Sequence, residues 1–113
     1  MKFLFKMVDE LRQIEIVFLK SKSGELIELI SPRSKDSVVA NLLEKHNNSF
    51  YHVGFLTTNI FHEVRELERK GFILILPPEE SVAFNHHKVA FLFNQFLGII
   101  ELVESADENR LFK

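Results

Sequence analysis

Two glutamates, Glu28 and Glu101, lie in the middle of apolar runs, and each is flanked on both sides by isoleucine or leucine. Ionised side chains are rarely placed among apolar residues unless they have a partner. A carboxylate in such a place can bind a cation or transfer a proton. Both residues are therefore candidates for a functional site.

The two glutamates occupy equivalent positions of an internal repeat. The offset is 73 residues (101 − 28 = 73), and it aligns residues 16–30 with residues 89–103 without a gap. A period of this length is typical of a duplicated supersecondary unit rather than of a solenoid repeat. The sequence therefore predicts two equivalent modules.

Composition narrows the class of protein. A chain of 113 residues predicts a single domain. Its net charge of −2, with acids and bases interspersed, argues against a nucleic-acid partner. Twelve phenylalanines, against one tyrosine and no tryptophan, favour a large apolar interior or a partly apolar cavity. The absence of cysteine excludes disulfides and thiolate metal sites, and it fits a cytoplasmic location.

We expect no signal peptide, because Lys6, Asp9 and Glu10 interrupt the apolar run at residues 1–7. No other apolar run approaches the about 20 residues that a membrane span needs. We therefore expect no membrane partner.

The first part of the chain predicts three antiparallel strands, at residues 2–8, 14–20 and 25–30. The third strand should end at Ser31-Pro32, because a proline cannot donate a hydrogen bond to a neighbouring strand. A linker helix should follow, capped by Ser34, Asp36 or Ser37 and ended by Asn47-Asn48.

The second part predicts a complete βαβββ unit. Its helix should be capped by Asn59 and end at Gly71, and Pro77-Pro78 should interrupt the strand that follows. The tail from residue 105 is expected to be polar and frayed, apart from Leu111-Phe112. The predicted strands are residues 50–57, 72–76, 88–93 and 97–104.

The first module is predicted to be shorter than the second. Under the 73-residue offset, the counterparts of the opening strand and helix would lie before Met1. The expected fold is α+β in a single domain, 1–113. It consists of a βββ module at 1–31, a linker helix at 32–49, a βαβββ module at 50–104 and a tail at 105–113.

Several of these segments resemble the vicinal oxygen chelate superfamily, which is also called the glyoxalase/bleomycin resistance/dioxygenase superfamily. The stretches that carry the resemblance are residues 50–55, 63–71, 89–92 and 98–102. Within that superfamily the chain is most similar to the methylmalonyl-CoA epimerases. That likeness rests on the order of three motifs, which are residues 26–32, 42–45 and 51–53. The similarity covers roughly residues 8–104, and it implies paired βαβββ modules.

The resemblance also implies a metal site. In the superfamily a curved sheet surrounds a divalent ion, with one ligand from each of four strands. Carried over by position, the ligands are Glu28, His52 and Glu101, and the fourth ligand has no position here. The ion implied is zinc, cobalt, manganese or iron. In the related epimerases it makes the carbon beside a thioester more acidic, and a carboxylate moves the proton. Glu101 is the candidate for that catalytic role, with Asp9 or Glu10 as alternatives.

Each candidate also has a structural explanation. A lone glutamate in a strand often faces solvent, and His52 fits an ordinary sheet histidine that is satisfied by a neighbouring hydrogen bond. His86 and His87 cannot bind one ion together if both lie in a strand, because adjacent residues point to opposite faces. If they lie in a loop, one of them could line the mouth of the cavity.

Three functions remain open at this point. The first is a metal-dependent epimerase, isomerase or lyase acting beside a carbonyl or thioester. The second is a non-catalytic protein that holds a small hydrophobic ligand in a dimeric cavity. The third is an altered gene product that keeps the structure without activity. The missing strand leaves an open sheet edge, which predicts a homodimer.

Overall fold

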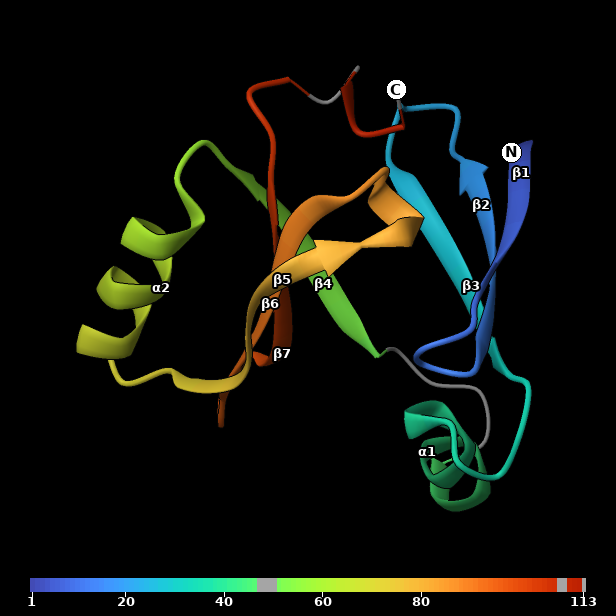
Figure 1. Ribbon diagram of the computed structural model, residues 1–113, viewed down its shortest axis with the longest axis horizontal. Coiled ribbons are helices and arrows are strands. Elements are labelled where there is room, and N and C mark those ends of the chain that lie inside the picture. Colours follow the sequence, from blue (N-terminus) through green and yellow to red (C-terminus); the bar gives the residue numbers. More distant parts are fainter. Residues whose placement is uncertain (47–50, 108–109, 113) are drawn as a thin grey trace. The chain divides into compact units, whose positions relative to one another are not determined.

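The computed structural model describes residues 1–46, 51–107 and 110–112 (Figure 1). The chain divides into two compact units, Met1–Ser49 and Phe50–Lys113. Over the described residues the secondary structure is α+β, with a three-stranded sheet in the first unit and a four-stranded sheet in the second. This confirms the predicted fold class.

The first unit is an antiparallel meander followed by a helix. Its strands are β1 (Lys2–Asp9), β2 (Ile14–Lys20) and β3 (Leu26–Pro32), and they pair in the order β1-β2-β3. Helix α1 (Val38–His46) begins after Ser37, whose hydroxyl accepts a hydrogen bond from the Val39 amide at 3.3 Å. The predicted helix end at Asn47-Asn48 lies outside the described residues.

Strand β2 supplies the core of the first unit. Ile14, Ile16 and Phe18 alternate along it, and all three are buried, as the period of two in a strand requires. The Phe5 ring of β1 lies 4.7 Å from the Phe18 ring. In the β2–β3 turn, hydrogen bonds from the Ser21 and Ser23 hydroxyls lower the pKa of the exposed Glu25 carboxyl.

The second unit is the complete βαβββ module that the sequence predicts. In its sheet β4 pairs with β7 in parallel, whereas β5–β6 and β6–β7 are antiparallel. The strand order is β4-β7-β6-β5. The elements are β4 (His52–Thr57), α2 (Ile60–Arg69), β5 (Ile73–Ser81), the short 3-10 helix η1 (Val82–Phe84), β6 (His87–Asn94) and β7 (Gly98–Glu104).

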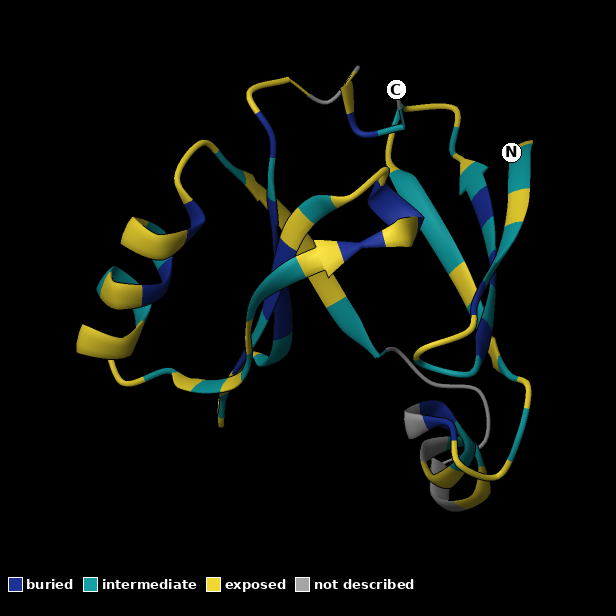
Figure 2. Cartoon of the chain, viewed as in Figure 1, coloured by how far each residue is buried: buried dark blue, intermediate teal, exposed yellow. Residues whose placement is uncertain are grey.

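Both predicted ends of helix α2 are confirmed. The Asn59 side chain accepts a hydrogen bond from the His62 amide at 3.1 Å, and the Glu104 carboxylate accepts one from the Ile60 amide at 2.9 Å. Gly71 adopts φ +98°, a conformation that favours glycine, just after the helix ends. The helix packs its buried side on one face of the sheet (Figure 2). The buried residues of that core are Ile60, Val64, Ala90, Leu92, Ile100 and Leu102.

Pro32 ends β3 as the sequence predicts, but Pro77 and Pro78 do not end β5. Strand β5 runs through Pro77 and Pro78, and β3 includes Pro32 as its last residue. Both are the outermost strands of their sheets, so one side of each has no ladder to which a proline would have to donate. The β5–β6 register also shifts between Leu76 and Glu79, which takes the two prolines out of the regular pairing.

The described part of the tail is held in place rather than frayed. The two ring nitrogens of His87 lie 2.9 Å from the Glu104 carbonyl oxygen and 3.0 Å from the Arg110 carbonyl oxygen. Leu111 is buried, and the Phe112 ring stacks on Phe84 with centroids 5.8 Å apart. His87 therefore connects the tail to β6 and β7. These contacts give His87 a structural role that the sequence does not reveal.

The internal repeat is visible in the strand register. In the β2–β3 hairpin Phe18 lies opposite Glu28, and in the β6–β7 hairpin Phe91 lies opposite Glu101. Both members of the second pair are 73 positions after the first (18 + 73 = 91; 28 + 73 = 101). The remaining pairs of the two hairpins follow the same offset from Ile16↔Ile30 to Lys20↔Leu26.

The repeat extends to an irregularity next to each hairpin. The β1–β2 register shifts between Phe3 and Phe5, and the β5–β6 register shifts between Leu74 and Leu76. The first shift affects the pairing of β2, which carries Phe18 opposite Glu28. The second affects the pairing of β6, which carries Phe91 opposite Glu101. The two sheets therefore share a three-strand core with one common register.

Candidate functional site

The candidate residues of the second unit lie on the face of its sheet that is opposite α2. Ile100 and Leu102 of β7 pack in the core beneath the helix, so Glu101 between them points to the other face. His52 is aligned with Ile99 in the parallel β4–β7 pairing and therefore shares the face of Glu101. Adjacent strands thus bring an imidazole and a carboxylate together, as the resemblance implied.

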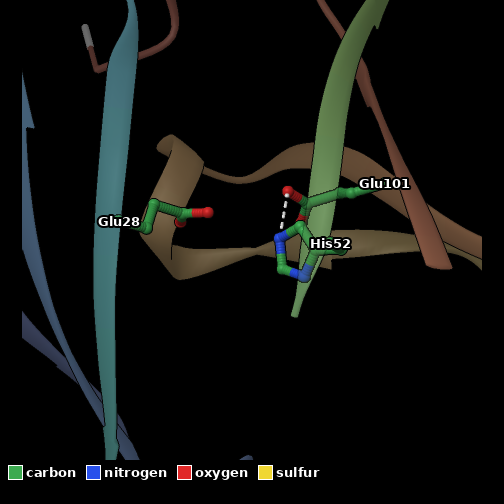
Figure 3. A group of neighbouring side chains, drawn as sticks. All are labelled: Glu28, His52 and Glu101. Atoms are coloured by element: carbon green, nitrogen blue, oxygen red, sulfur yellow. Dashed lines mark ion pairs between the residues drawn. The ribbon is translucent and has the colours of Figure 1, made fainter. Parts of the chain in front are cut away.

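The His52 imidazole and the Glu101 carboxylate face each other in Figure 3. His52 Nε2 lies 3.3 Å from Glu101 Oε1, and each side chain is 7% exposed. Two ligands of a tetrahedral zinc, at bond lengths of about 2.0–2.1 Å, are about 3.3 Å apart. A histidine nitrogen and a carboxylate oxygen at this distance fit a divalent cation, and they equally fit a buried ion pair.

A glycine keeps the space beside Glu101 open. Gly54 of β4 lies opposite Glu101, and a Cβ atom built on it would be 3.6 Å from Glu101 Oε1. That distance is an ordinary van der Waals contact, so a small side chain would fit but would occupy the space next to the carboxylate. The β4–β7 register places Gly54 next to Glu101 in the sheet.

Two aromatic side chains surround the His52 ring. The Phe91 ring lies 5.1 Å from it at an interplanar angle of 72°, and the Tyr51 ring lies 4.7 Å from it at 61°. Sequence reasoning missed both residues as part of the site. Phe91 could have been found from the repeat, because it is the residue that pairs with Glu101.

Glu28 belongs to the first unit, where it lies on β3 and is drawn in Figure 3. It is half-buried and pairs across the hairpin with the fully buried Phe18. It does not face solvent in the way that a glutamate on an exposed strand would. Leu29, the next residue on β3, is 54% exposed and points to the other face.

The alternative carboxylates near the start of β2 have structural partners. Asp9 is buried and accepts hydrogen bonds from the Arg12 amide at 3.1 Å and from the Arg12 guanidinium at 2.8 Å. Glu10 is paired with Arg33 at 2.8 Å. These contacts hold the β1–β2 turn, and they make Asp9 and Glu10 poorer candidates for proton transfer than Glu101.

Comparison with protein families gives one match. The profile of the Glyoxalase/Bleomycin resistance protein/Dioxygenase superfamily matches residues 1–91. Among curated proteins, none matches the chain. Over the described residues no helix has the length and apolarity needed to cross a membrane.

Several solved structures have a similar fold. A hypothetical protein from Bacillus halodurans C-125 is 23% identical with a TM-score of 0.82, and the match covers 95% of this chain and 78% of that one. Methylmalonyl-CoA epimerase from Mycobacterium tuberculosis is 20% identical with a TM-score of 0.78, over 95% and 73%. A variant of the Streptomyces coelicolor methylmalonyl-CoA epimerase in complex with 2-nitronate-propionyl-CoA is 20% identical with a TM-score of 0.77, over 94% and 80%. At these identities the likeness establishes the fold.

Proposed function

We propose, since this chain belongs to the Glyoxalase/Bleomycin resistance protein/Dioxygenase superfamily, that it binds one divalent metal ion and acts beside a carbonyl or thioester group of a small substrate. The reaction class is that of an epimerase, isomerase or lyase. The observation that carries this proposal is the buried pair of His52 Nε2 and Glu101 Oε1, 3.3 Å apart. Two structural neighbours are methylmalonyl-CoA epimerases, which supports a thioester as the first substrate to test.

We propose His52, Glu101 and Glu28 as the metal ligands, because each offers one ligand atom of a type that zinc, cobalt, manganese and iron accept. A divalent ion, when bound, stabilises negative charge that develops on a carbonyl oxygen. Glu101 is the proposed proton carrier, and its burial would keep competing water from the carboxylate. His52 would supply an imidazole nitrogen to the ion, and Gly54 leaves room for the substrate beside Glu101.

The test combines metal content with proton exchange. We expect about one divalent ion per chain by mass spectrometry on protein purified without a histidine tag. The loaded protein should then introduce solvent deuterium next to the thioester of methylmalonyl-CoA in D2O. Metal without deuterium incorporation would exclude methylmalonyl-CoA as the substrate, and it would support a protein that keeps the structure without this activity. No metal, even after incubation with zinc, cobalt or manganese, would contradict the proposal.

A second candidate function is the storage or transport of a small hydrophobic ligand. It is favoured by Ile73 and Phe93, which pair across β5 and β6 on the face of the sheet that carries Glu101. They are 63% and 38% exposed, an unusual state for two neighbouring large apolar side chains. Binding of an apolar fluorescent probe that persists in EDTA would distinguish this function from the metal-dependent one.

We further propose that the protein forms a homodimer through β4. This strand lies at one edge of its sheet, and its Val53, Phe55 and Leu56 are 58%, 52% and 46% exposed. An apolar edge strand readily pairs with a second chain, and pairing of β4 with its own copy about a two-fold axis would be antiparallel.

Sedimentation tests the proposed dimer. We expect a dimer of the wild type that the Phe55→Lys substitution shifts toward monomer, because a charge at the centre of a strand edge opposes pairing. The matched control is Phe61→Lys, which places the same charge on α2 at a side chain that is 51% exposed. A wild type that remains monomeric at all concentrations would contradict the proposal.

A further inference from the structure

The ring of His52 is held between two aromatic side chains of the same unit. Phe91 presents a T-shaped contact at 5.1 Å and Tyr51 one at 4.7 Å. The Tyr51 and Phe91 rings are themselves stacked, at 6.5 Å and 21°. We propose that Phe91 and Tyr51 are positioning residues, which fix the imidazole in the orientation that turns Nε2 toward Glu101.

The backbone explains why Tyr51 can reach the imidazole. Consecutive residues of a strand point to opposite faces, so a residue next to His52 within β4 could not contact its ring in this way. Tyr51 precedes the strand, which begins at His52, and its side chain is therefore free of the alternation. Because β4 begins at His52, the preceding Tyr51 can turn its side chain onto the face of the sheet that carries the site.

The register explains the place of Phe91. It is directly opposite Glu101 in the β6–β7 pairing, and Glu101 is aligned with Gly54 two residues after His52. The phenylalanine therefore lies beside the carboxylate and against the imidazole at once. Its equivalent in the first unit, Phe18, packs instead on Phe5 at 4.7 Å. The same repeat position thus serves the core in one unit and the candidate site in the other.

The orientation of the His52 imidazole affects how tightly it can bind a metal ion. A histidine binds a metal well when its neighbours fix the plane of its ring, and loss of an outer-shell partner that orients a ligand typically lowers metal affinity about 10–100-fold. Edge-to-face contacts between aromatic rings have a preferred geometry, so they restrict rotation of the imidazole about its χ2 bond. Tyr51 and Phe91 would supply this restriction from two sides.

The experiment compares Phe91→Leu with Phe93→Leu. Phe93 lies on the same strand and the same face but opposite Ile99, so it is a matched control for loss of a phenylalanine ring. Nuclear spin relaxation of the His52 ring carbons, measured on metal-free protein, reports whether the ring is fixed. We expect a rigid ring in the wild type and in Phe93→Leu, and a mobile ring in Phe91→Leu. Zinc affinity, by competition with a chromogenic chelator, should fall about 10-fold in Phe91→Leu alone.

This inference rests on the proposed function only for the affinity measurement. A wild type that binds no zinc would contradict the proposed function, whereas the relaxation of the metal-free ring would still decide the positioning role. An equally rigid ring in Phe91→Leu would overturn the inference, and so would an equal loss of zinc affinity in the two variants. If Phe91→Leu does not fold, Tyr51→Leu replaces it, and Tyr51→Phe, which keeps the ring, should restore the wild-type behaviour.

Discussion

Replacement of His52 by leucine is expected to lower the free energy of unfolding of the metal-free protein by about 3 kcal/mol. Glu101 is 5% exposed, and its Oε1 lies 3.3 Å from His52 Nε2. Removal of one partner from a buried pair typically costs about 3–5 kcal/mol, because the other partner keeps its cost of desolvation and loses the interaction that offset it. Urea denaturation in EDTA, followed by circular dichroism, measures the change.

The control for this substitution is His62→Leu. His62 is an exposed residue of α2, and surface changes of this kind usually alter stability by less than about 0.5 kcal/mol. The double variant His52→Leu/Glu101→Leu should recover much of the loss, because an apolar pair of similar volume carries no buried charge. A loss below about 0.5 kcal/mol for His52→Leu would mean that the pair contributes little to the fold.

Most of the fold could be predicted from the sequence, because local patterns determine it. Alternation of apolar residues identified β1, a high content of β-branched and aromatic residues identified β2, and a polar cap with a glycine stop identified α2. The 73-residue offset correctly indicated a duplicated unit, and the shared register of the two hairpins confirms it. Pro77 and Pro78 were misjudged because the effect of a proline depends on whether its strand lies at the edge of the sheet, which only the pairing order reveals.

Contacts between distant segments were beyond prediction. His87 is held by the carbonyl oxygens of Glu104 and Arg110, which are 17 and 23 residues away in the chain. No local pattern encodes such a partner, and for the same reason the burial of Leu111 was not expected to fix the tail. The Tyr51–His52–Phe91 group likewise depends on where β4 begins and on which residue of β6 lies opposite Glu101.

The residues of the candidate site could be predicted from the sequence, whereas their contacts could not. Residue type and the resemblance selected His52 and Glu101, and the structure brings the two side chains together. The sequence could not show whether each side chain contacts a metal ion, a hydrogen-bonding group or solvent, because this depends on how deeply the side chain is buried. With both side chains 7% exposed, the solvent-facing alternative for Glu101 is wrong.

The Glu28→Gln substitution is expected to weaken zinc binding by about 100-fold. Loss of a residue that only orients a metal ligand lowers affinity by up to about 100-fold, and loss of a ligand should cost no less. Glutamine keeps the size of the side chain but removes the negative charge that a divalent ion needs. The structural reason is the repeat, in which Glu28 lies opposite Phe18 as Glu101 lies opposite Phe91. This equivalence is the reason that we propose both carboxylates as metal ligands.

The matched control for Glu28→Gln is Glu15→Gln in the same sheet. Glu15 alternates with the buried Ile14 and Ile16 along β2, and it pairs with Lys6 at 3.8 Å. It therefore points away from the face that carries Glu28, and its loss should leave zinc affinity unchanged. Isothermal titration of zinc into both variants separates the two glutamates. Wild-type affinity in Glu28→Gln would mean that the first unit gives no ligand, and that His52 and Glu101 must bind the ion without it.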